Sequence, residues 1–419
     1  MRWPRYGQMK ASGVAWLGEV PGHWDVKRLK RVVHVSGGMT PDKSEPDFWD
    51  GDMPWVTAKD MKSLRLADSE DHVSPSALRA TGLKPVTPPA SLIVVRGMIL
   101  AHTFPVAEID APVTINQDMK ALRPAADLAP GYLAWMLRGS SGYVLSIADE
   151  SAHGTKALRT DRLFEMQIPL PPADEQRAIA AFLDRETARI DALVAAKRRL
   201  IGVLQERRAA LIARAVTRGL DPDVSTKDSG VPWLGRVPVN WDVMPLKHAV
   251  RFQRGHDLPA DERRDGDVPV VSSAGVSAWH DEAIAAAPGI TTGRYGTIGQ
   301  FTYVEEPYWP LNTVLYSIDI AANHARFLWW MLHLLKPLFV LNSQKSAVPG
   351  VDRNDLHPVL IAVPPRLEQE QIAAHLDAPS KRHSLMESAI AEAISRLTEY
   401  RSTLITSAVT GRIDVRGAA

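Results

Sequence analysis

The chain contains one 47-residue segment twice, and this repeat constrains the fold more than any other feature. Residues 171–217 align without a gap to residues 364–410, an offset of 193 positions, and 20 of the 47 aligned residues are identical. The identities include Pro-Pro-x-x-Glu-Gln at the start and Ala-Val-Thr at the end. Such self-similarity indicates that the chain is an internal duplication of one structural unit.

Each copy has the pattern of one long helix. No proline lies between Glu175 and Ala215, and apolar residues recur at the 3.5-residue spacing of a coiled-coil seam. In the second copy Pro379 interrupts the pattern, so we expect a kink there or a restart with Asp377 as the cap. The residues expected to pair the helices are Leu183, Ile190, Leu193, Leu200, Leu204 and Leu211 in the first copy and Leu376, Met386, Ile390, Leu397 and Leu404 in the second.

The charges of the two copies favour pairing within the chain. Asp174 to Thr217 holds nine basic and six acidic side chains, a net charge of +3. Arg366 to Thr410 holds five basic and six acidic side chains, a net charge of −1. Opposite bias favours contact between the copies. For either copy alone, a surface helix packed on a core is the alternative.

A second repeat precedes each variable region. Trp-Leu-Gly-Glu-Val-Pro-Gly-His-Trp at 16–24 recurs as Trp-Leu-Gly-Arg-Val-Pro-Val-Asn-Trp at 233–241. The variable regions mix short strand-like runs with helical stretches and lack a regular βαβ rhythm, which predicts α+β domains. The expected layout is a lead-in at 1–24, a variable domain at 25–165, a long helix at 166–218, a linker and second lead-in at 219–241, a second variable domain at 242–358, a second long helix at 359–411 and a tail at 412–419.

Composition restricts the class of protein further. A chain of 419 residues with 45% apolar and 23% charged residues is typical of a soluble protein of two to three domains. The absence of cysteine excludes disulfides, thiolate zinc sites and cysteine nucleophiles. The first ten residues lack the apolar core of a signal peptide, and the run from Phe327 to Leu332 is too short to cross a bilayer, so we expect a cytoplasmic protein.

Motifs for bond chemistry are missing from the sequence. It has no P-loop, no Asn- or Asp-Pro-Pro-aromatic loop of an adenine methyltransferase and no paired histidine spacing for a metal. Asp60-Met-Lys62 and Asp118-Met-Lys120 match half of a metal-dependent nuclease pattern, as many solvated loops do. We therefore expect no catalytic residue, no metal site and no cofactor in this chain.

The order of these parts resembles the specificity subunits of type I restriction-modification systems. The likeness is carried by Ile-Pro-Leu-Pro-Pro-Ala-Asp-Glu-Gln at 168–176, its copy at 361–369, both tryptophan lead-ins, and the segments 51–60 and 116–120. It implies two target-recognition domains in a pseudo-two-fold repeat, separated by two long antiparallel helices. Each domain would bind one half of a split sequence on double-stranded DNA.

The resemblance also implies partners. Two adenine-methyltransferase subunits would dock around the helices and use S-adenosylmethionine. Restriction subunits that depend on ATP and Mg²⁺ could join them. Candidate docking positions lie on the outward helix faces at Arg198, Arg199, Arg208, Glu392 and Glu399.

Candidate DNA contacts are basic and polar residues on turn-like stretches, because phosphates and base edges are bound by such side chains. In the first domain they are Lys59, Lys62, Arg96, His153, Thr155, Lys156 and Arg159. In the second they are Arg254, His256, Arg294, Ser343, Gln344 and Lys345. A solvated surface position is the alternative for each. For the whole chain, the alternatives are a coiled-coil interaction scaffold and, with less support, a nuclease.

Overall fold

The computed structural model describes the whole chain except residues 1–2, 151–154, 295–296, 339–350 and 418–419. The chain forms two compact units. Unit 1 comprises Met1–Ala196 with Ala393–Ala419, and unit 2 comprises Lys197–Glu392. The duplication expected from the sequence is therefore present as two structural units, and both long helices contribute to both.

The two long helices are α5 (Ala173–Arg218) and α10 (Arg366–Val409). Helix α10 continues through Pro379, so the expected restart at Asp377 was wrong. The Asp377 carboxylate instead accepts hydrogen bonds from Arg326 Nε at 2.9 Å and Trp330 Nε1 at 3.0 Å. Because proline has no N–H, α10 lacks one helical hydrogen bond at this position.

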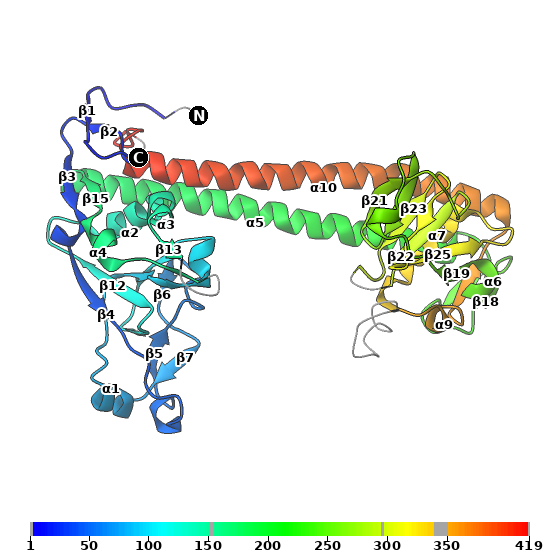
Figure 1. Cartoon of the computed structure of the whole chain (residues 1–419), viewed down its shortest axis with the longest axis horizontal. Helices are drawn as coiled ribbons and strands as arrows, with labels where there is room; N and C mark the ends of the chain where they lie inside the picture. The colour runs from blue at the N-terminus through cyan, green and yellow to red at the C-terminus, as the bar shows by residue number, and fades with distance from the viewer. Residues whose placement is uncertain (1–2, 151–154, 295–296, 339–350, 418–419) are drawn as a thin grey trace. The chain divides into compact units, whose positions relative to one another are not determined.

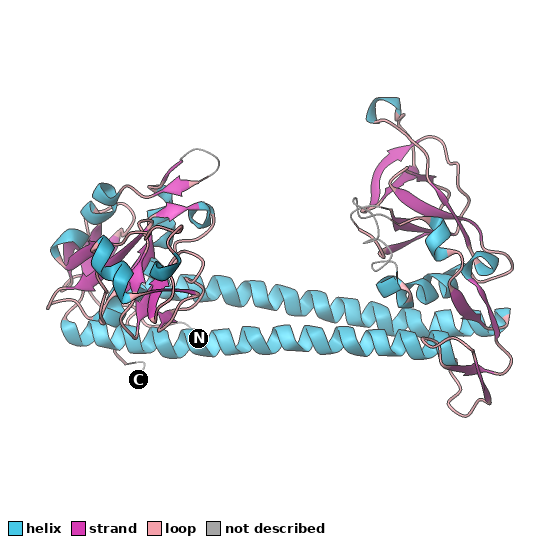
Figure 2. Cartoon of the chain, turned by 90° about the horizontal axis from the view of Figure 1, so that it is seen from below, coloured by secondary structure: helices cyan, strands magenta, loops and turns pink. Residues whose placement is uncertain are grey.

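The long helices pack together in each unit, and they run in opposite directions (Figures 1 and 2). In unit 1, Leu183 and Ile190 of α5 share one buried core with Leu404 of α10. In unit 2, Ile212 of α5 shares another core with Leu376 of α10. The fold class predicted from the sequence, α+β units on paired long helices, is confirmed.

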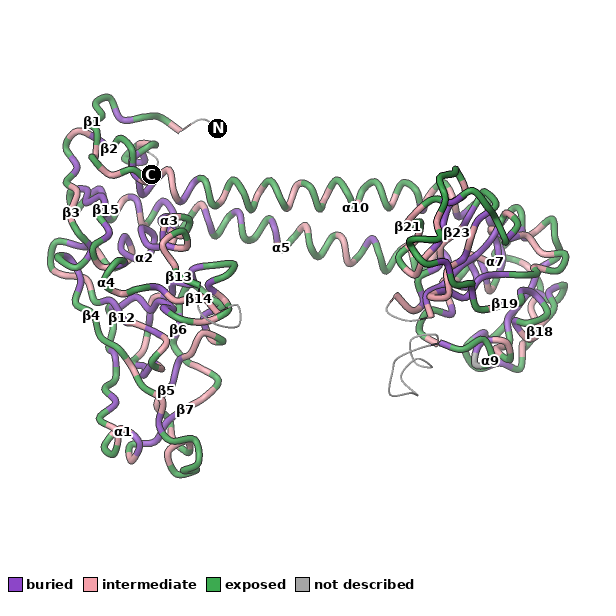
Figure 3. Tube along the Cα trace, in the orientation of Figure 1, coloured by how far each residue is buried: buried purple, intermediate pink, exposed green. Residues whose placement is uncertain are grey.

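The predicted pairing residues differ in burial. Leu183, Ile190, Leu204, Leu376 and Leu404 are buried, and Leu211, Ile390 and Leu397 are partly buried. Leu193 and Leu200 are 46% and 45% exposed, and Met386 is 42% exposed. Figure 3 shows exposed positions along much of both helices. These three side chains are not part of the buried cores that the helices share.

Unit 1 is built on two mixed sheets. The larger has the order β4-β12-β8-β10-β6 and the smaller the order β11-β5-β7. The strands are β4 (Val33–Gly37), β5 (Met53–Val56), β6 (Arg65–Leu66), β7 (Asp71–Val73), β8 (Ser91–Val94), β10 (Val106–Ile109), β11 (Thr114–Ile115) and β12 (Met119–Pro124).

Shorter elements complete unit 1. Strand pairs are β1 (Met9–Ala11) with β2 (Glu19–Pro21) and β3 (Asp25–Arg28) with β15 (Gln167–Leu170), and β9 (Arg96–Gly97), β14 (Lys156–Ala157) and β13 (Asp149–Glu150) form a ribbon. The helices are α1 (Pro75–Thr81), α2 (Pro130–Gly139), α3 (Ser141–Ser146) and α4 (Thr160–Glu165). Helix α2 is buried from Tyr132 to Leu137, as a helix between a sheet and the long helices must be.

Unit 2 repeats this plan. One sheet has the order β19-β25-β22-β23 and the other the order β21-β20-β24. The strands are β16 (Thr226–Asp228), β17 (Arg236–Pro238), β18 (Asp242–Pro245), β19 (Arg251–Arg254), β20 (Val268–Ser272), β21 (Gly275–His280), β22 (Gly289–Gly293), β23 (Phe301–Val304), β24 (Trp309–Pro310), β25 (Val314–Asp319) and β26 (Leu360–Val363). The helices are α6 (Leu246–Ala249), α7 (Ala325–Leu334) and α9 (Arg353–Leu356).

The glutamine of the repeated Pro-Pro-x-x-Glu-Gln motif fastens each long helix to its unit. Gln176 accepts a hydrogen bond from the Ala129 N–H at 2.7 Å and donates to the Asp127 and Pro171 carbonyls at 3.0 and 2.9 Å. Gln369 likewise accepts from the His324 N–H at 2.7 Å and donates to the Pro364 carbonyl at 2.8 Å. The motif is therefore structural, since each amide satisfies backbone groups at the start of α2 or α7.

A glycine ends each long helix in the left-handed region. Gly219 has a φ of 74° and Gly411 a φ of 72°. A Cβ on Gly411 would lie 2.3 Å from Pro21 of the lead-in, which no side chain tolerates. Glycine is thus required where the chain leaves α10 against the first lead-in.

Candidate nucleic-acid interface

In unit 2, three predicted DNA-contact residues line one cleft of about 690 Å³. They are Arg254 at the end of β19, His256 just beyond it and Arg294 directly after β22. Sheet pairing explains why they meet, because β19 and β22 flank β25 on either side. A further arginine, Arg353 at the start of α9, lines the same cleft.

The charges of this cleft favour an anion. Its lining holds Arg254, Arg294 and Arg353 against two carboxylates, Asp257 and Asp352. Asp352 accepts a hydrogen bond from the Asn354 N–H at 2.7 Å and so caps α9. In the described part of the chain, neither Arg254 nor Arg353 makes an ion pair. The cleft therefore presents guanidinium groups in the form that binds phosphate or guanine edges.

The backbone holds these groups in place. The Arg294 N–H donates to the Thr313 carbonyl at 2.9 Å, and the Val351 N–H donates to the Arg294 carbonyl at 3.0 Å. His256 lies 3.2 Å from the Tyr316 hydroxyl through its Nε2. The arginine side chains thus extend from a fixed backbone frame, which is what a recognition surface needs.

In unit 1, Arg96, Thr155 and Lys156 come together on the ribbon β9-β14-β13. Strand β14 pairs antiparallel with β9, with Ala157 opposite Arg96 and Lys156 opposite Gly97. Arg96 lies one position beyond the counterpart of Arg294, because Val95 directly follows β8 as Arg294 directly follows β22. Met98, beside the ribbon, is 70% exposed. The ribbon thus carries two basic residues, Arg96 and Lys156, beside the exposed acidic pair Asp149 and Glu150 of β13, with Glu150 opposite Lys156.

The other residues of unit 1 predicted to contact DNA either lie away from the β9-β14-β13 ribbon or already bind a carboxylate of the chain. Arg159 forms an ion pair with Asp161 at 2.7 Å. Lys59, on the loop after β5, bonds Asp71 at 2.8 Å, and this hydrogen bond raises the pKa of the Lys59 ammonium. Lys62 is exposed on the same loop. His153, Ser343, Gln344 and Lys345 lie outside the described residues.

The predicted docking positions fall into two groups. Arg198, Arg199, Glu392 and Glu399 are exposed on the long helices. Arg208 is half-buried and lines a cavity in unit 2. Among the residues the structure describes, no group of three or more His, Cys, Asp or Glu side chains could hold a metal ion.

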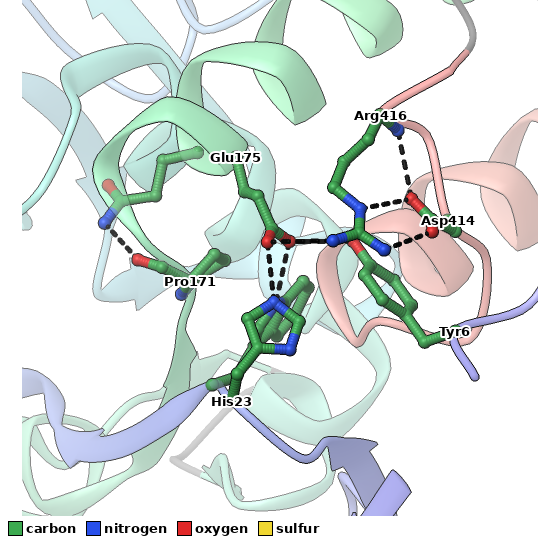
Figure 4. Close-up of polar contacts among 8 residues, drawn as sticks. Tyr6, His23, Pro171, Glu175, Asp414 and Arg416 are labelled. Atoms are coloured by element: carbon green, nitrogen blue, oxygen red, sulfur yellow. Dashed lines mark hydrogen bonds and ion pairs between the residues drawn. The ribbon is translucent and has the colours of Figure 1, made fainter. Parts of the chain in front are cut away.

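A buried carboxylate connects the lead-in, α5 and the tail of unit 1 (Figure 4). Glu175 accepts hydrogen bonds from the Tyr6 hydroxyl at 3.1 Å and Trp24 Nε1 at 3.0 Å, and it lies 2.6 Å from His23 Nε2. Arg416 Nη1 lies 3.7 Å from Glu175, and Arg416 Nη2 pairs with Asp414 at 2.6 Å, which lowers the pKa of the Asp414 carboxyl. Burial and Glu175 raise the pKa of the Tyr6 hydroxyl. The cluster fixes the fold and leaves no group poised for bond chemistry.

The chain thus has the architecture of a duplicated α+β protein built on a pair of long helices. The chain matches the type I restriction modification DNA specificity domain over residues 21–200 and 238–396, and it belongs to this family. Specificity subunits are the non-catalytic components of type I restriction-modification complexes. The resemblance predicted from the repeats is confirmed.

Individual relatives share parts of the chain. It is 32% identical over 165 residues to the specificity subunit of the Escherichia coli type I restriction enzyme EcoR124I/EcoR124II, covering 39% of this chain and 41% of that subunit. It is 25% identical over 252 residues to the MjaIX specificity subunit of Methanocaldococcus jannaschii, covering 59% and 56%. The chain thus spans about half the length of these two relatives.

The fold extends over nearly the whole chain in a solved structure. A chain from a study of complex assembly and conformational transition of the type I restriction-modification system superimposes with a TM-score of 0.72 at 16% identity. The match covers 94% of this chain and 99% of that one. At this identity the likeness establishes the arrangement of elements. In the part of the chain that the structure describes, no helix is long and apolar enough to span a membrane.

Proposed function

We propose that this chain reads a bipartite DNA target for a type I restriction-modification complex, with the variable domain of each unit binding one half-site. The observation that carries the proposal is that the two units share one frame but differ on the surface. The ribbon of unit 1 presents Arg96 and Lys156, and the cleft of unit 2 presents Arg254, Arg294 and Arg353. Different surfaces on one frame imply two different half-sites.

Within this proposal the arginines and lysines have two roles. Contacts with phosphates position the protein, and contacts with base edges select the sequence. Arg254 and Arg294 lie beside Gln253 and His256 in one cleft, so both kinds of donor are available there. Residues 25–165 and 242–358 form the two recognition domains, and residues 219–241 are the linker and second lead-in before the second domain.

The partners follow from the same proposal. Two methyltransferase subunits dock along the exposed faces of α5 and α10 and bring S-adenosylmethionine. Restriction subunits, where present, bring the ATP- and Mg²⁺-dependent steps. The exposed side chains Arg198, Arg199, Glu392 and Glu399 are the candidate positions for this docking. The complex acts in the cytoplasm, where the DNA of the cell is.

The test is a map of methylated adenines in a host that expresses the chain with its methyltransferase subunits. The expected result is one split motif with a fixed spacer. Arg254→Ala together with Arg353→Ala should relax or abolish one half of the motif and leave the other half unchanged. Arg79→Ala, on α1 of unit 1, is the matched control and should leave both halves intact.

Binding measurements complete the test. Each lost phosphate contact lowers the slope of log affinity against log salt by about 1 unit. Lys156→Ala with Arg96→Ala should therefore flatten the slope by about 2 units if both side chains contact phosphate. A complex that enriches no split motif from a duplex library would instead be a scaffold.

A further inference from the structure

A cavity of about 440 Å³ in unit 2 lies where α7 packs on α5 and α10, apart from the DNA cleft at β19, β22 and α9. We call it the Arg208 cavity. The side chains that matter here are Arg208 of α5, Arg326 and Trp329 of α7, and Asp377, Lys381 and Ser384 of α10.

The internal repeat shows what this cavity lacks. In unit 1, Arg401 donates to both carboxylate oxygens of Asp191, at 2.8 and 3.0 Å. The 193-residue offset makes Arg208 the counterpart of Arg401 (208 + 193 = 401) and Ser384 the counterpart of Asp191 (191 + 193 = 384). Unit 2 therefore keeps the arginine but has a hydroxyl in place of the carboxylate.

Arg208 has no replacement partner in the described part of the chain. Its Nε is buried and makes no hydrogen bond there. Glu387, three positions after Ser384 on α10, has a buried Oε1 that is also without a hydrogen bond. Arg208 as a whole is half-buried, so its guanidinium is partly removed from water without a carboxylate partner, and an anion that reaches it is favoured.

Of the other charged residues of the cavity, Arg326 and Asp377 pair with each other, and Lys381 adds to the excess of positive charge. Arg326 pairs with Asp377 at 2.9 Å and stacks over Trp329 at 4.2 Å. Lys381 makes no ion pair among the described residues. The lining thus holds three cations against one engaged carboxylate. Ser380, only 4% exposed, adds a hydroxyl without a hydrogen-bond partner.

The cavity is specific to unit 2. Tyr132 of α2 aligns with Phe327 of α7, so Arg326 corresponds to Gly131 and Trp329 to Ala134. Unit 1 thus has glycine and alanine where unit 2 has Arg326 and Trp329. Its nearby arginine, Arg138, stacks over Trp135 at 4.6 Å and donates to the Val106 carbonyl, and its Arg401 is paired with Asp191. An anion site built this way exists in one unit of an otherwise repeated frame.

We propose that the Arg208 cavity binds a carboxylate side chain of a protein subunit that docks on the long helices, and that this anchor is absent from unit 1. The inference rests on the proposed function for the existence of such subunits. A side chain fits an opening walled by Trp329 and bordered by three helices, and its carboxylate restores the ion pair that Asp191 provides in unit 1. The two docked subunits are then held unequally.

Ser384→Asp tests this by placing a carboxylate of the chain itself beside Arg208. The variant should keep or raise the melting temperature, because it recreates the unit 1 ion pair. It should also weaken association of the full chain with purified methyltransferase subunits by about tenfold or more, since removing one partner of a buried charge pair has effects of this size. Arg208→Ala should weaken association similarly. Ser225→Asp, which adds the same charge at an exposed position after α5, should not.

The outcomes separate the alternatives. Unchanged or tighter association of Ser384→Asp overturns the proposal. If association is unchanged but DNA affinity falls, the anion is a phosphate and the proposal is again overturned. If Glu387→Gln lowers the melting temperature as much as Arg208→Ala and association stays intact, Glu387 is the partner. Failure of the proposed function looks different, because the unaltered chain would then neither bind methyltransferase subunits nor direct a split motif.

Discussion

Glu175 and Glu368 occupy the same position of the repeat but make different contacts. Glu175 is 6% exposed and is surrounded by Tyr6, His23, Trp24 and Arg416. Glu368 is half-buried and accepts one hydrogen bond from Asn240 at 3.3 Å. The tryptophan equivalent to Trp24, Trp241, has a buried Nε1 without a partner in the described chain. The carboxylate network is thus complete in one unit only.

This difference predicts unequal effects of one substitution. Glu175→Gln removes the charge that several donors share and should lower the free energy of unfolding by about 2–3 kcal/mol, since hydrogen bonds to charged groups contribute about 1.5–3 kcal/mol. Glu368→Gln should cost less than about 1 kcal/mol. Urea denaturation followed by tryptophan fluorescence measures both. Equal effects would mean that the additional contacts of Glu175 shown in Figure 4 add no stability beyond the contacts of Glu368.

At the scale of single residues, the sequence identified important positions but did not predict their contacts. Glu175 and Gln176 stood out because the motif is repeated. Their partners could not be foreseen, because Gln176 bonds Ala129, 47 positions away, and Glu175 bonds Trp24, 151 positions away. Arg353 was missed because its neighbourhood with Arg254 depends on the folded sheet. No local pattern marks it.

At the scale of elements, periodicity and proline placement predicted the long helices well. The pattern could not show how much of each face the partner covers, so Leu193 and Leu200 were expected in the seam although both are nearly half exposed. Nor could it show that α10 would continue through Pro379. Packing of Leu376 and its neighbours in the core of unit 2 outweighs the single hydrogen bond that proline removes.

Pro379 and its counterpart Glu186 (186 + 193 = 379) give a matched pair of helix substitutions. Pro379→Ala lets an N–H donate to the His375 carbonyl and should raise stability by about 1–3 kcal/mol. Glu186→Pro should lower stability by about 3 kcal/mol or more. Thermal unfolding followed by far-UV circular dichroism measures both. If Pro379→Ala is neutral or destabilising, the proline-adapted geometry of α10 is itself required for packing.

At the scale of the whole molecule, the segment after each long helix leads to a tryptophan lead-in. In unit 1 the Asp414 N–H donates to the Pro4 carbonyl at 2.8 Å, and Arg416 lies over the Tyr6 ring at 4.9 Å. The tail after α10 is thus fastened to the first lead-in. In unit 2 the chain instead runs without a break from α5 through Gly219 and residues 221–230 to the second lead-in. The two junctions between a long helix and a lead-in are therefore equivalent in the repeat.

A circular permutant follows from this equivalence. In this permutant the termini are joined through a short glycine-serine linker, and the chain is opened between Asp221 and Pro222, which are both exposed. The new chain ends then follow α5 instead of α10. Because no core residue is disturbed, the permutant should unfold within about 1 kcal/mol of the parent. It should also direct the same methylation motif. The control is a permutant opened inside α7, between Leu328 and Trp329. It should not fold, because Leu328 and Trp330 are buried. Loss of one half of the motif in the first permutant, with stability retained, would show that the junctions differ in function although they share a fold.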